Sequence, residues 1–305
     1  MSAETRRFGP YTVQLERLDK VLYPEAEITK RDVVGYYEAV AGALLAHLQD
    51  RPLTLRRFPD GIGEEGFYQK QVPDYSPGWI SRVDVPLADG GRQEQITAGN
   101  AATLAYLAGQ AALELHPWLS RTPALDTPDQ IVFDLDPGEE RGFEDVRSAA
   151  LHLRELLECL EMKPRVMVTG SSGAHLRVPL RAGSGFDEVR AFARRVVDHL
   201  AALHPDDLTV EARKNARKGR LYLDVARNAR GQTAVTPYSL RALPGAPVAV
   251  PLEWDEFRRT ESARSYTLAS VPRRLEKRGD PWKGMGREAR SLDRAREAGR
   301  SILEE

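Results

Sequence analysis

The sequence predicts an α+β fold in which mixed, largely antiparallel sheets are flanked by helices. In the second half of the chain, residues alternate between apolar and polar as in strands, or repeat apolar positions every three or four residues as in helices. These segments follow in the order strand, helix, strand, strand, helix, strand. Because this order places the helices on one side of a small sheet, the other face is free to carry a site.

The individual elements follow from the same patterns. Thr29 caps a helix, since an acidic residue stands three positions on and apolar residues then recur at helical spacing. Those apolar residues are Val33, Tyr36, Tyr37, Val40 and Leu44. A second helix is expected over residues 100–115, within a stretch otherwise broken by Pro and Gly. In the second half, we expect strands over residues 131–136, 165–169, 175–180 and 221–225 and helices over residues 143–162 and 186–203.

The composition is that of an ordinary soluble protein. The 305 residues include 41% hydrophobic and 29% charged side chains, and 44 basic against 45 acidic residues give a formal net charge of −1. Nucleic-acid binding must therefore rest on local patches, since no global basic field exists. The N-terminus lacks an apolar stretch behind its basic residues, and we expect a cytoplasmic protein with no membrane partner. The single cysteine, Cys159, excludes a disulfide framework and is expected to be a buried structural thiol.

Three aspartates are the strongest candidates for chemistry. Asp134 and Asp136 point to one side of the strand 131–136, while its apolar residues point to the core. Asp224 lies in the same way on the strand 221–225. Three carboxylates on neighbouring strands match a two-metal phosphoryl-transfer site, because divalent cations offset the cost of placing like charges together. Taken singly, each aspartate can equally be an ordinary residue of a polar strand face, with Asp136 starting a turn.

A loop rich in glycine and serine and a basic segment accompany these aspartates. The loop, residues 169–173 (TGSSG), has backbone amides and hydroxyls that can hold phosphate oxygens, and His175 follows on the next strand. Cations surround Asp224, as the negative charge of a triphosphate would require. They are Arg213, Lys214, Arg217, Lys218, Arg220, Arg227, Arg230 and, further on, Arg241. A plain hairpin, a structural histidine and a solvated charged face are the alternatives.

Motifs in a fixed order run through most of the chain, from about Tyr11 to Met285. In the first half they are KVLYP (20–24), RFPDG (57–61) and ELHPW (114–118). In the second half they are VFDLDPG (132–138), the loop up to His175, YLD (222–224), Asn228, GQT (231–233), PYSLRA (237–242), PGAPV (244–248), PL (251–252) and WDE (254–256). With these motifs the chain resembles the polymerase domain of bacterial ligase D, in the end-joining branch of the archaeo-eukaryotic primase superfamily.

The resemblance implies a primase-polymerase catalytic core with an RRM-like strand-helix-strand-strand-helix-strand unit. It divides the chain into an N-terminal subdomain that contacts DNA ends and template (1–125), the catalytic core (126–257) and an Arg-rich C-terminal wrapping segment (258–305), all in one structural unit. It implies a template-directed nucleotidyltransferase that uses two Mn²⁺ or Mg²⁺ ions and NTP or dNTP. Such an enzyme fills gaps and extends DNA ends in bacterial non-homologous end joining.

The resemblance also implies partners. DNA ends and gapped DNA with a 5′-phosphate are the expected nucleic-acid partners. Ku and a separate DNA ligase are the candidate protein partners, and the expected location is the cytoplasm, at the nucleoid. The chain has no Lys-x-Asp-Gly ligase signature, so we expect either a stand-alone polymerase or an excised domain. Met1 and the weakly periodic tail up to Glu305 favour the stand-alone polymerase.

The resemblance also implies roles for particular residues. Asp134, Asp136 and Asp224 become the catalytic, metal-binding carboxylates, and the residues that contact the incoming nucleotide are Thr169, Ser171, Ser172, His175, Arg217 and Arg241. Lys20 and Lys30 keep the ten-residue spacing of a lysine pair that grips the 5′-phosphate. Phe67 and Tyr68 fall where paired aromatics stack on the template, and His116 falls where a histidine positions template or metal. Core packing is the alternative for the two aromatics.

The chain departs from the family pattern in its phosphate loop. Thr169 replaces the first serine, and Ser172 replaces a lysine. We expect weaker triphosphate binding, or a transfer of that task to Arg217 and Arg241. Arg17 stands where the family often has asparagine. The preferred sugar stays open, although ribonucleotides are typical of the family.

Three alternative functions remain. A primase that starts chains de novo does not need the 5′-phosphate contact that Lys20 and Lys30 suggest. A DNA-end-binding module that recruits repair partners and has lost polymerisation does not need three carboxylates and His175. A metal-dependent nuclease would use the same aspartates and would shorten its substrate.

Overall fold

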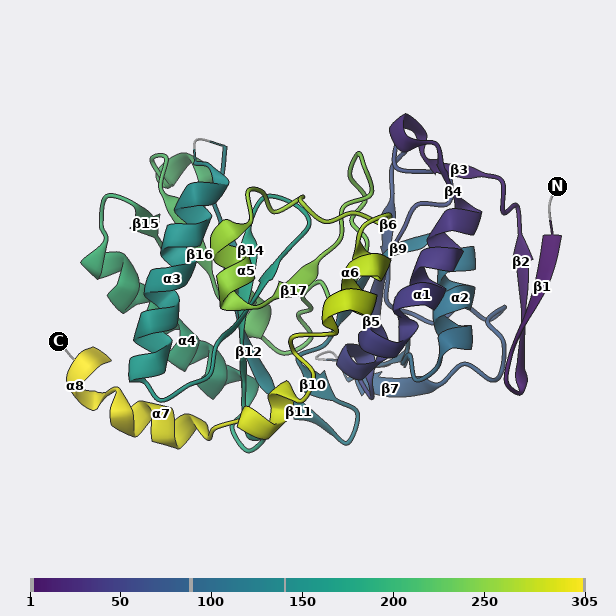
Figure 1. Ribbon diagram of the computed structural model, residues 1–305. Coiled ribbons are helices and arrows are strands. Elements are labelled where there is room, and N and C mark those ends of the chain that lie inside the picture. Colours follow the sequence, from purple (N-terminus) through teal and green to yellow (C-terminus); the bar gives the residue numbers. More distant parts are fainter. Residues whose placement is uncertain (1–2, 88–89, 140, 304–305) are drawn as a thin grey trace. The chain divides into compact units, whose positions relative to one another are not determined.

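The chain folds into two compact units in a computed structural model that describes residues 3–87, 90–139 and 141–303 (Figure 1). Contacts group the residues up to 123, residues 235–250 and residues 266–280 into the first unit. Residues 124–234, residues 251–265 and the residues from 281 on form the second unit. This grouping differs from a linear division at residues 125 and 257, because two later segments return to the first unit; the linear division stays a prediction.

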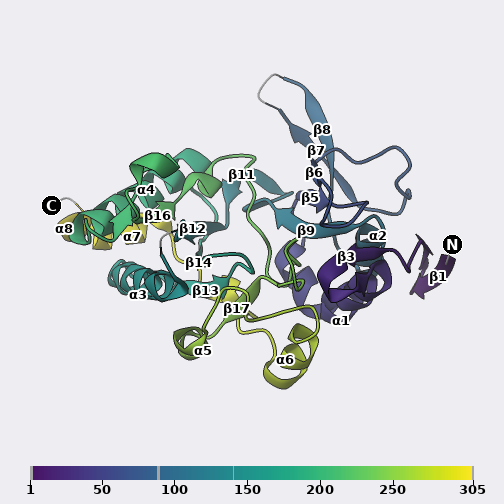
Figure 2. The ribbon, with the colours of Figure 1, turned by 90° about the horizontal axis from the view of Figure 1, so that it is seen from above.

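The first unit combines helices with a three-stranded sheet of order β6-β5-β9. Its longer helices, α1 (Lys30–Leu48) and α2 (Ala101–Gly109), pack against each other. Figure 2 shows that the hairpin β7–β8 extends away from α1. The other elements are β1 (Ala3–Phe8), β2 (Tyr11–Glu16), β3 (Val21–Tyr23), η1 (Pro24–Ala26), β4 (Ile28–Thr29), β5 (Leu53–Arg57), β6 (Phe67–Gln69), β7 (Arg82–Pro86), β8 (Arg92–Ile96), β9 (Ala112–Pro117), β10 (Ser120–Arg121) and α6 (Val271–Arg278).

Helix α1 begins where the sequence predicts. The Thr29 side chain accepts a hydrogen bond from the Asp32 backbone N–H, and the Asp32 carboxylate accepts one from the Thr29 N–H, so two otherwise unpaired amides are satisfied. The apolar face of α1 is buried, and the Tyr37 hydroxyl donates to the Leu113 carbonyl oxygen at 2.6 Å. A buried hydroxyl without such a partner would destabilise the core. The prediction for this helix is confirmed.

The prediction of one helix over residues 100–115 is wrong beyond Gly109. Asn100 caps α2 by accepting from the Thr103 N–H at 2.9 Å, and the helix ends within three turns. Ala111 has a φ of +56°, a left-handed conformation that stops a helix of L-residues. The following residues form β9, which pairs antiparallel with β5. The pairing of a buried strand outweighs the helix propensity of the segment ALEL.

The second unit is built on a six-stranded sheet of order β15-β16-β12-β14-β13-β17. Its strands are β12 (Gln130–Asp136), β13 (Arg165–Val168), β14 (Ala174–Pro179), β15 (Leu208–Thr209), β16 (Leu221–Asp224) and β17 (Val250–Leu252). Its helices are α3 (Phe143–Cys159), α4 (Phe186–Leu203), α5 (Trp254–Arg259), α7 (Leu292–Ala298) and α8 (Arg300–Leu303). Shorter elements are β11 (Ala124–Pro128), η2 (Lys214–Ala216), η3 (Ala226–Asn228) and η4 (Met285–Glu288).

The predicted order of the second half is confirmed. Strands β12, β13, β14 and β16 and helices α3 and α4 follow as strand, helix, strand, strand, helix, strand. The two helices contact each other and β12. The α+β prediction with largely antiparallel sheets is therefore correct. Helix α3 ends three residues before the predicted Met162, and Cys159 is exposed, so the expectation of a buried thiol is wrong.

The described helices include none long and apolar enough to span a lipid bilayer.

Candidate functional site

The three predicted aspartates meet on one face of the second unit's sheet. In the antiparallel register of β12 and β16, Asp134 lies opposite Asp224, and Asp136 lies opposite Tyr222. All three carboxylates are half-buried, while the alternate residues Phe133 and Leu135 are fully buried. The strand alternation thus sets an acidic face, which we define as Asp134, Asp136 and Asp224.

Arg217 neutralises part of this acidic face. Its guanidinium donates to Asp136 Oδ2 at 2.8 Å, and its other nitrogens donate to the carbonyl oxygens of Glu211 and Ala212. The side chain is buried and lies over the Tyr222 ring, 4.2 Å from its centroid. A buried guanidinium held by three acceptors keeps one orientation. Arg217 is therefore positioned at the acidic face, while its contact with a triphosphate stays a prediction.

The donor atoms of the acidic face are of the type that divalent cations prefer. Carboxylate oxygens are the ligands that Mg²⁺ and Mn²⁺ prefer, and three of them share one side of two paired strands. Within the described parts of the chain, no group of three or more His, Cys, Asp and Glu side chains converges as it stands. Asp136 instead accepts a hydrogen bond from Arg217, and Asp224 Oδ1 accepts one from the Ala226 N–H at 2.7 Å. A cation that binds here competes with Arg217 for Asp136.

The glycine- and serine-rich loop closes next to the acidic face. The Thr169 hydroxyl and N–H both donate to the Gly173 carbonyl oxygen, which closes the turn. Gly173 is required, because a Cβ atom there would lie 1.9 Å from the Leu135 carbonyl oxygen. Ser171 is half-buried and Ser172 is exposed at the tip. The Arg264 side chain donates to the Ser171 carbonyl oxygen at 3.1 Å, a contact that no sequence motif indicates.

His175 lies directly beside the acidic face. The β12–β14 register places it opposite Asp134, and its Nε2 atom is 3.5 Å from Asp134 Oδ1. The imidazole is buried. The structure therefore brings His175, Arg217 and the three aspartates together, whereas Arg241 belongs to the first unit.

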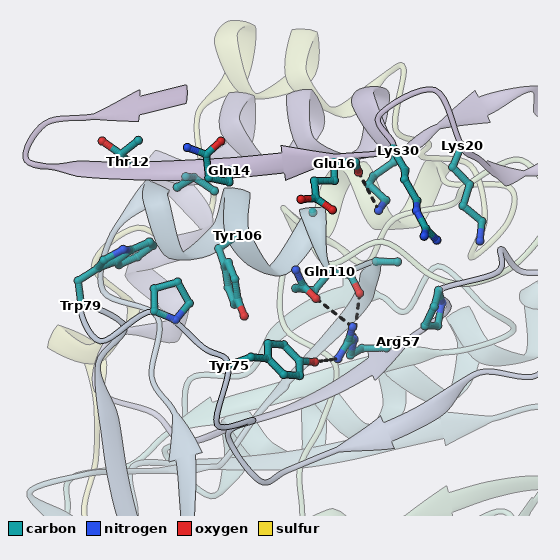
Figure 3. A pocket seen from close by; sticks show the side chains of 16 residues that line it. Thr12, Gln14, Glu16, Lys20, Lys30, Arg57, Tyr75, Trp79, Tyr106 and Gln110 are labelled. Carbon is teal, nitrogen blue, oxygen red and sulfur yellow. Dashed lines mark hydrogen bonds between the residues drawn. The ribbon is translucent and has the colours of Figure 1, made fainter. Parts of the chain in front are cut away.

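Lys20 and Lys30 are brought together by the hairpin β3–β4. The Lys30 N–H donates to the Lys20 carbonyl oxygen at 2.8 Å, and both side chains line a cavity of about 560 Å³ in the first unit (Figure 3). Burial lowers the pKa of Lys30, and the neighbouring cations Lys20, Arg17 and Arg57 lower it further. A bound anion would therefore stabilise the charged form of Lys30.

Phe67 and Tyr68 are exposed on β6, by 46% and 62% respectively. The core alternative for these two aromatics is therefore excluded. The ring of Tyr68 meets the ring of His116 edge-on, with 6.2 Å between centroids. Exposed rings of this kind form a surface on which nucleobases can stack.

Glu114 is a functional candidate that the sequence interpretation missed. It is buried beneath His116, and its carboxylate accepts hydrogen bonds from His116, Arg56 and the Ala242 N–H, with Arg241 Nε at 3.4 Å. Burial raises its pKa, but His116, Arg241 and the Ala242 N–H outweigh burial and lower the pKa to about 2. A carboxylate within the apolar strand β9 was the available signal, because a buried acid needs cationic partners.

The six-stranded sheet, the acidic face and the similarity to known proteins together identify a nucleotidyltransferase of the primase-polymerase type. Residues 29–282 match the family model described as LigD, primase-polymerase domain, and the chain belongs to that family. The family is one of metal-dependent nucleotidyltransferases that use nucleoside triphosphates.

The relatives agree in sequence and in structure. The chain is 34% identical over 270 residues to the multifunctional non-homologous end joining protein LigD of Mycolicibacterium smegmatis, covering 88% of this chain and 35% of that protein. It is 32% identical over 272 residues to the bifunctional LigD of Bacillus subtilis, covering 88% and 43%. The polymerase domain of Mycobacterium tuberculosis ligase D, solved in complex with DNA, matches with a TM-score of 0.85 and 32% identity, over 91% of this chain and 99% of that domain. The chain thus spans less than half the length of the curated relatives.

Proposed function

We propose that this chain is a template-directed polymerase that fills gaps and extends broken DNA ends in bacterial non-homologous end joining. The register that sets Asp134 against Asp224, with Asp136 on the same face, is the observation that carries the proposal. The DNA bound in the structure of the similar M. tuberculosis domain supports DNA as the substrate. The cytoplasm at the nucleoid is the proposed location, with Ku and a separate DNA ligase as protein partners.

Each residue of the acidic face has a proposed task. Asp134, Asp136 and Asp224 would hold two Mn²⁺ or Mg²⁺ ions. When bound, such ions activate the attacking 3′-hydroxyl of the primer and stabilise charge on the α-phosphate and the pyrophosphate leaving group. His175 and the amides of the loop around Ser171 bind phosphate oxygens of the incoming NTP or dNTP. Thr169 keeps the loop closed, and Ser172 offers a hydroxyl at its exposed tip.

Arg217 has two proposed partners in turn. It neutralises Asp136 in the structure described here, at 2.8 Å. Because a guanidinium binds phosphate oxygens as readily as carboxylates, Arg217 can pass from Asp136 to the triphosphate when Asp136 turns to a cation. This exchange compensates for the lysine that Ser172 replaces. Arg241, held by Glu114, is proposed to serve the same triphosphate.

The residues of the first unit position DNA. Lys20 and Lys30 would bind the 5′-phosphate on the far side of a gap, since paired cations at a half-buried site favour a phosphate monoester. Phe67 and Tyr68 would stack on the template, and His116 would position it.

The test is extension of a labelled primer on a templated gap that carries a 5′-phosphate, in Mn²⁺ and in Mg²⁺, with ribonucleotides and deoxyribonucleotides offered separately. Growth that matches the template supports the polymerase and reports its metal and sugar preferences. Growth without a primer would favour the primase, and shortening would favour the nuclease. Binding of gapped DNA without any growth would favour a recruiting module and would overturn the proposal.

A further inference from the structure

The cavity that holds Lys20 and Lys30 is much larger than a phosphate. Its volume of about 560 Å³ falls in the range of sites that enclose whole small molecules. Figure 3 shows the two lysines at one end, Trp79 at the opposite end, and Tyr106 and Gln110 between them. We define residues Arg17, Lys20, Lys30 and Arg57 as the cationic end, and residues Tyr75, Trp79 and Tyr106 as the aromatic end.

At the cationic end, Lys20 already forms an ion pair with the exposed carboxylate of Asp60, so the charge available for an anion comes chiefly from Arg57 and Lys30. Arg57 is buried, and within the described parts of the chain its guanidinium donates to neutral acceptors: the Gln110 carbonyl oxygen at 2.9 Å, Gln110 Oε1, Gln69 Oε1 and the Tyr75 hydroxyl. Lys30 Nζ donates to the backbone oxygen of Glu16 at 3.1 Å. The Glu16 side chain also lines the cavity, and its negative charge offsets part of the charge of Lys30. Buried cations that lack a carboxylate partner gain most when an anion binds. A phosphate monoester satisfies this end.

The side chains of the aromatic end carry no positive charge, so they do not contribute to binding a phosphate. The ring of Trp79 meets that of Tyr106 edge-on at 6.4 Å and leans on that of Tyr11 at 5.0 Å, so neighbouring rings fix its orientation. The Tyr75 side chain is 65% exposed, although its hydroxyl is anchored 3.0 Å from Arg57. Gln14, Gln110 and Thr12 add polar groups to the same wall. Oriented rings together with amide groups are the features that bind a nucleobase by stacking and by edge hydrogen bonds.

The Tyr75 hydroxyl connects the two ends, because it binds the guanidinium that faces the lysines. A ligand with a phosphate at one end and a flat heterocycle at the other therefore matches the cavity along its whole length. A 5′-terminal nucleotide has this composition.

We propose that this cavity binds the entire 5′-terminal nucleotide of the downstream strand, with its phosphate on the cationic end and its base unpaired from the template and seated among Tyr75, Trp79 and Tyr106. The proposal rests on the proposed recognition of a 5′-phosphate and extends it to the base. It makes the first unit a reader of frayed or single-stranded 5′ ends.

The test compares three ligands by calorimetry on the full chain without divalent cations: inorganic phosphate, 2-deoxyribose 5-phosphate and thymidine 5′-monophosphate. Stacking of one base contributes enough for the nucleotide to bind about tenfold more tightly than the sugar phosphate. Trp79→Leu keeps apolar volume and removes the large ring, and it should bring the affinity for the nucleotide down to that for the sugar phosphate. Trp254→Leu, in the second unit, is the matched control and should leave all three affinities unchanged.

The outcomes separate this proposal from the one it rests on. Equal affinity for sugar phosphate and nucleotide, in an enzyme that still prefers a phosphorylated gap, overturns the base-binding proposal alone. A nucleotide advantage that survives both Trp79→Leu and Tyr75→Ala also overturns it, because the base then binds elsewhere. If no ligand binds and gap filling ignores the 5′-phosphate, the proposed phosphate recognition fails as well.

Discussion

The acidic face of the second unit and the cationic cavity of the first unit are assembled in opposite ways. The acidic face comes from two strands that are neighbours in one sheet, and the alternation of each strand decides which side its carboxylates take. The cavity takes residues from β2, from both sides of the hairpin β3–β4, from β5, from the segment 75–79 and from α2, which share no periodic pattern. Reacting groups can therefore be encoded locally, whereas a ligand-shaped cavity depends on how distant segments pack.

The largest effect is expected for a substitution in the acidic face. Asp136→Ala should lower the rate of primer extension about a thousandfold or more, because metal-held charge stabilisation is worth several kcal/mol in the transition state. Binding of gapped DNA should stay within about threefold, since base and phosphate contacts lie elsewhere. Single-turnover extension and an equilibrium binding assay measure the two quantities. Asp187→Asn, at an exposed position of α4, is the control, and substantial extension by Asp136→Ala would refute the assignment.

The next effect concerns Glu114. Its folded pKa of about 2 lies below the ordinary value of 4.5, so the stability it contributes is present above pH 4.5 and is lost as the pH falls towards 2. The expected contribution is on the order of 3 kcal/mol. Glu114→Gln should lower the free energy of unfolding at neutral pH and flatten its pH dependence between these values.

Urea unfolding at a series of pH values measures this effect. Glu64→Gln, at an exposed site of the same unit, is the matched control. A Glu114→Gln variant as stable as the wild type, with an unchanged pH dependence, would show that the buried carboxylate does not hold its cationic neighbours in place.

A smaller effect is expected at the cationic end of the cavity. Lys20→Ala combined with Lys30→Ala should reduce the preference for a phosphorylated over an unphosphorylated gap by roughly ten- to a hundredfold, because charge-assisted hydrogen bonds are lost. Extension of an open template–primer should be unaffected, since these residues position an end and perform no chemistry. Lys277→Ala provides an exposed lysine for comparison. A preserved preference would remove the lysine pair from the proposed function.

The smallest expected effect is at Tyr68. Because its ring is 62% exposed, Tyr68→Ala should change the free energy of unfolding by no more than about 0.5 kcal/mol. Affinity for template–primer DNA should nevertheless fall about fivefold or more, through lost stacking. Thermal unfolding and fluorescence anisotropy separate the two readouts. Unchanged affinity of Tyr68→Ala for template–primer DNA would contradict a stacking role for this residue.

Much of the fold could be predicted where local patterns are strong. The cap at Thr29, the face of α1 and the order from β12 to β16 each depend on residues close together in the sequence. The segment 110–117 could not be predicted, since its Ala and Leu residues favour a helix and only pairing with β5 makes them a strand. Cys159 was misplaced for a related reason: it sits in the last turn of α3, where the leucines around it are buried and it is not.

The sequence by itself determined the α+β class, the acidic face and the spacing of Lys20 and Lys30, because strand alternation and short hairpins are set by neighbouring residues. Only the tertiary structure decided that Arg217 binds Asp136, that Glu114 gathers His116, Arg56 and Arg241, and that Arg57 joins the lysines in one cavity with Trp79. These contacts join residues far apart in the chain. Burial and charge pairing of such residues arise only when the segments pack, and no pattern along the sequence records them.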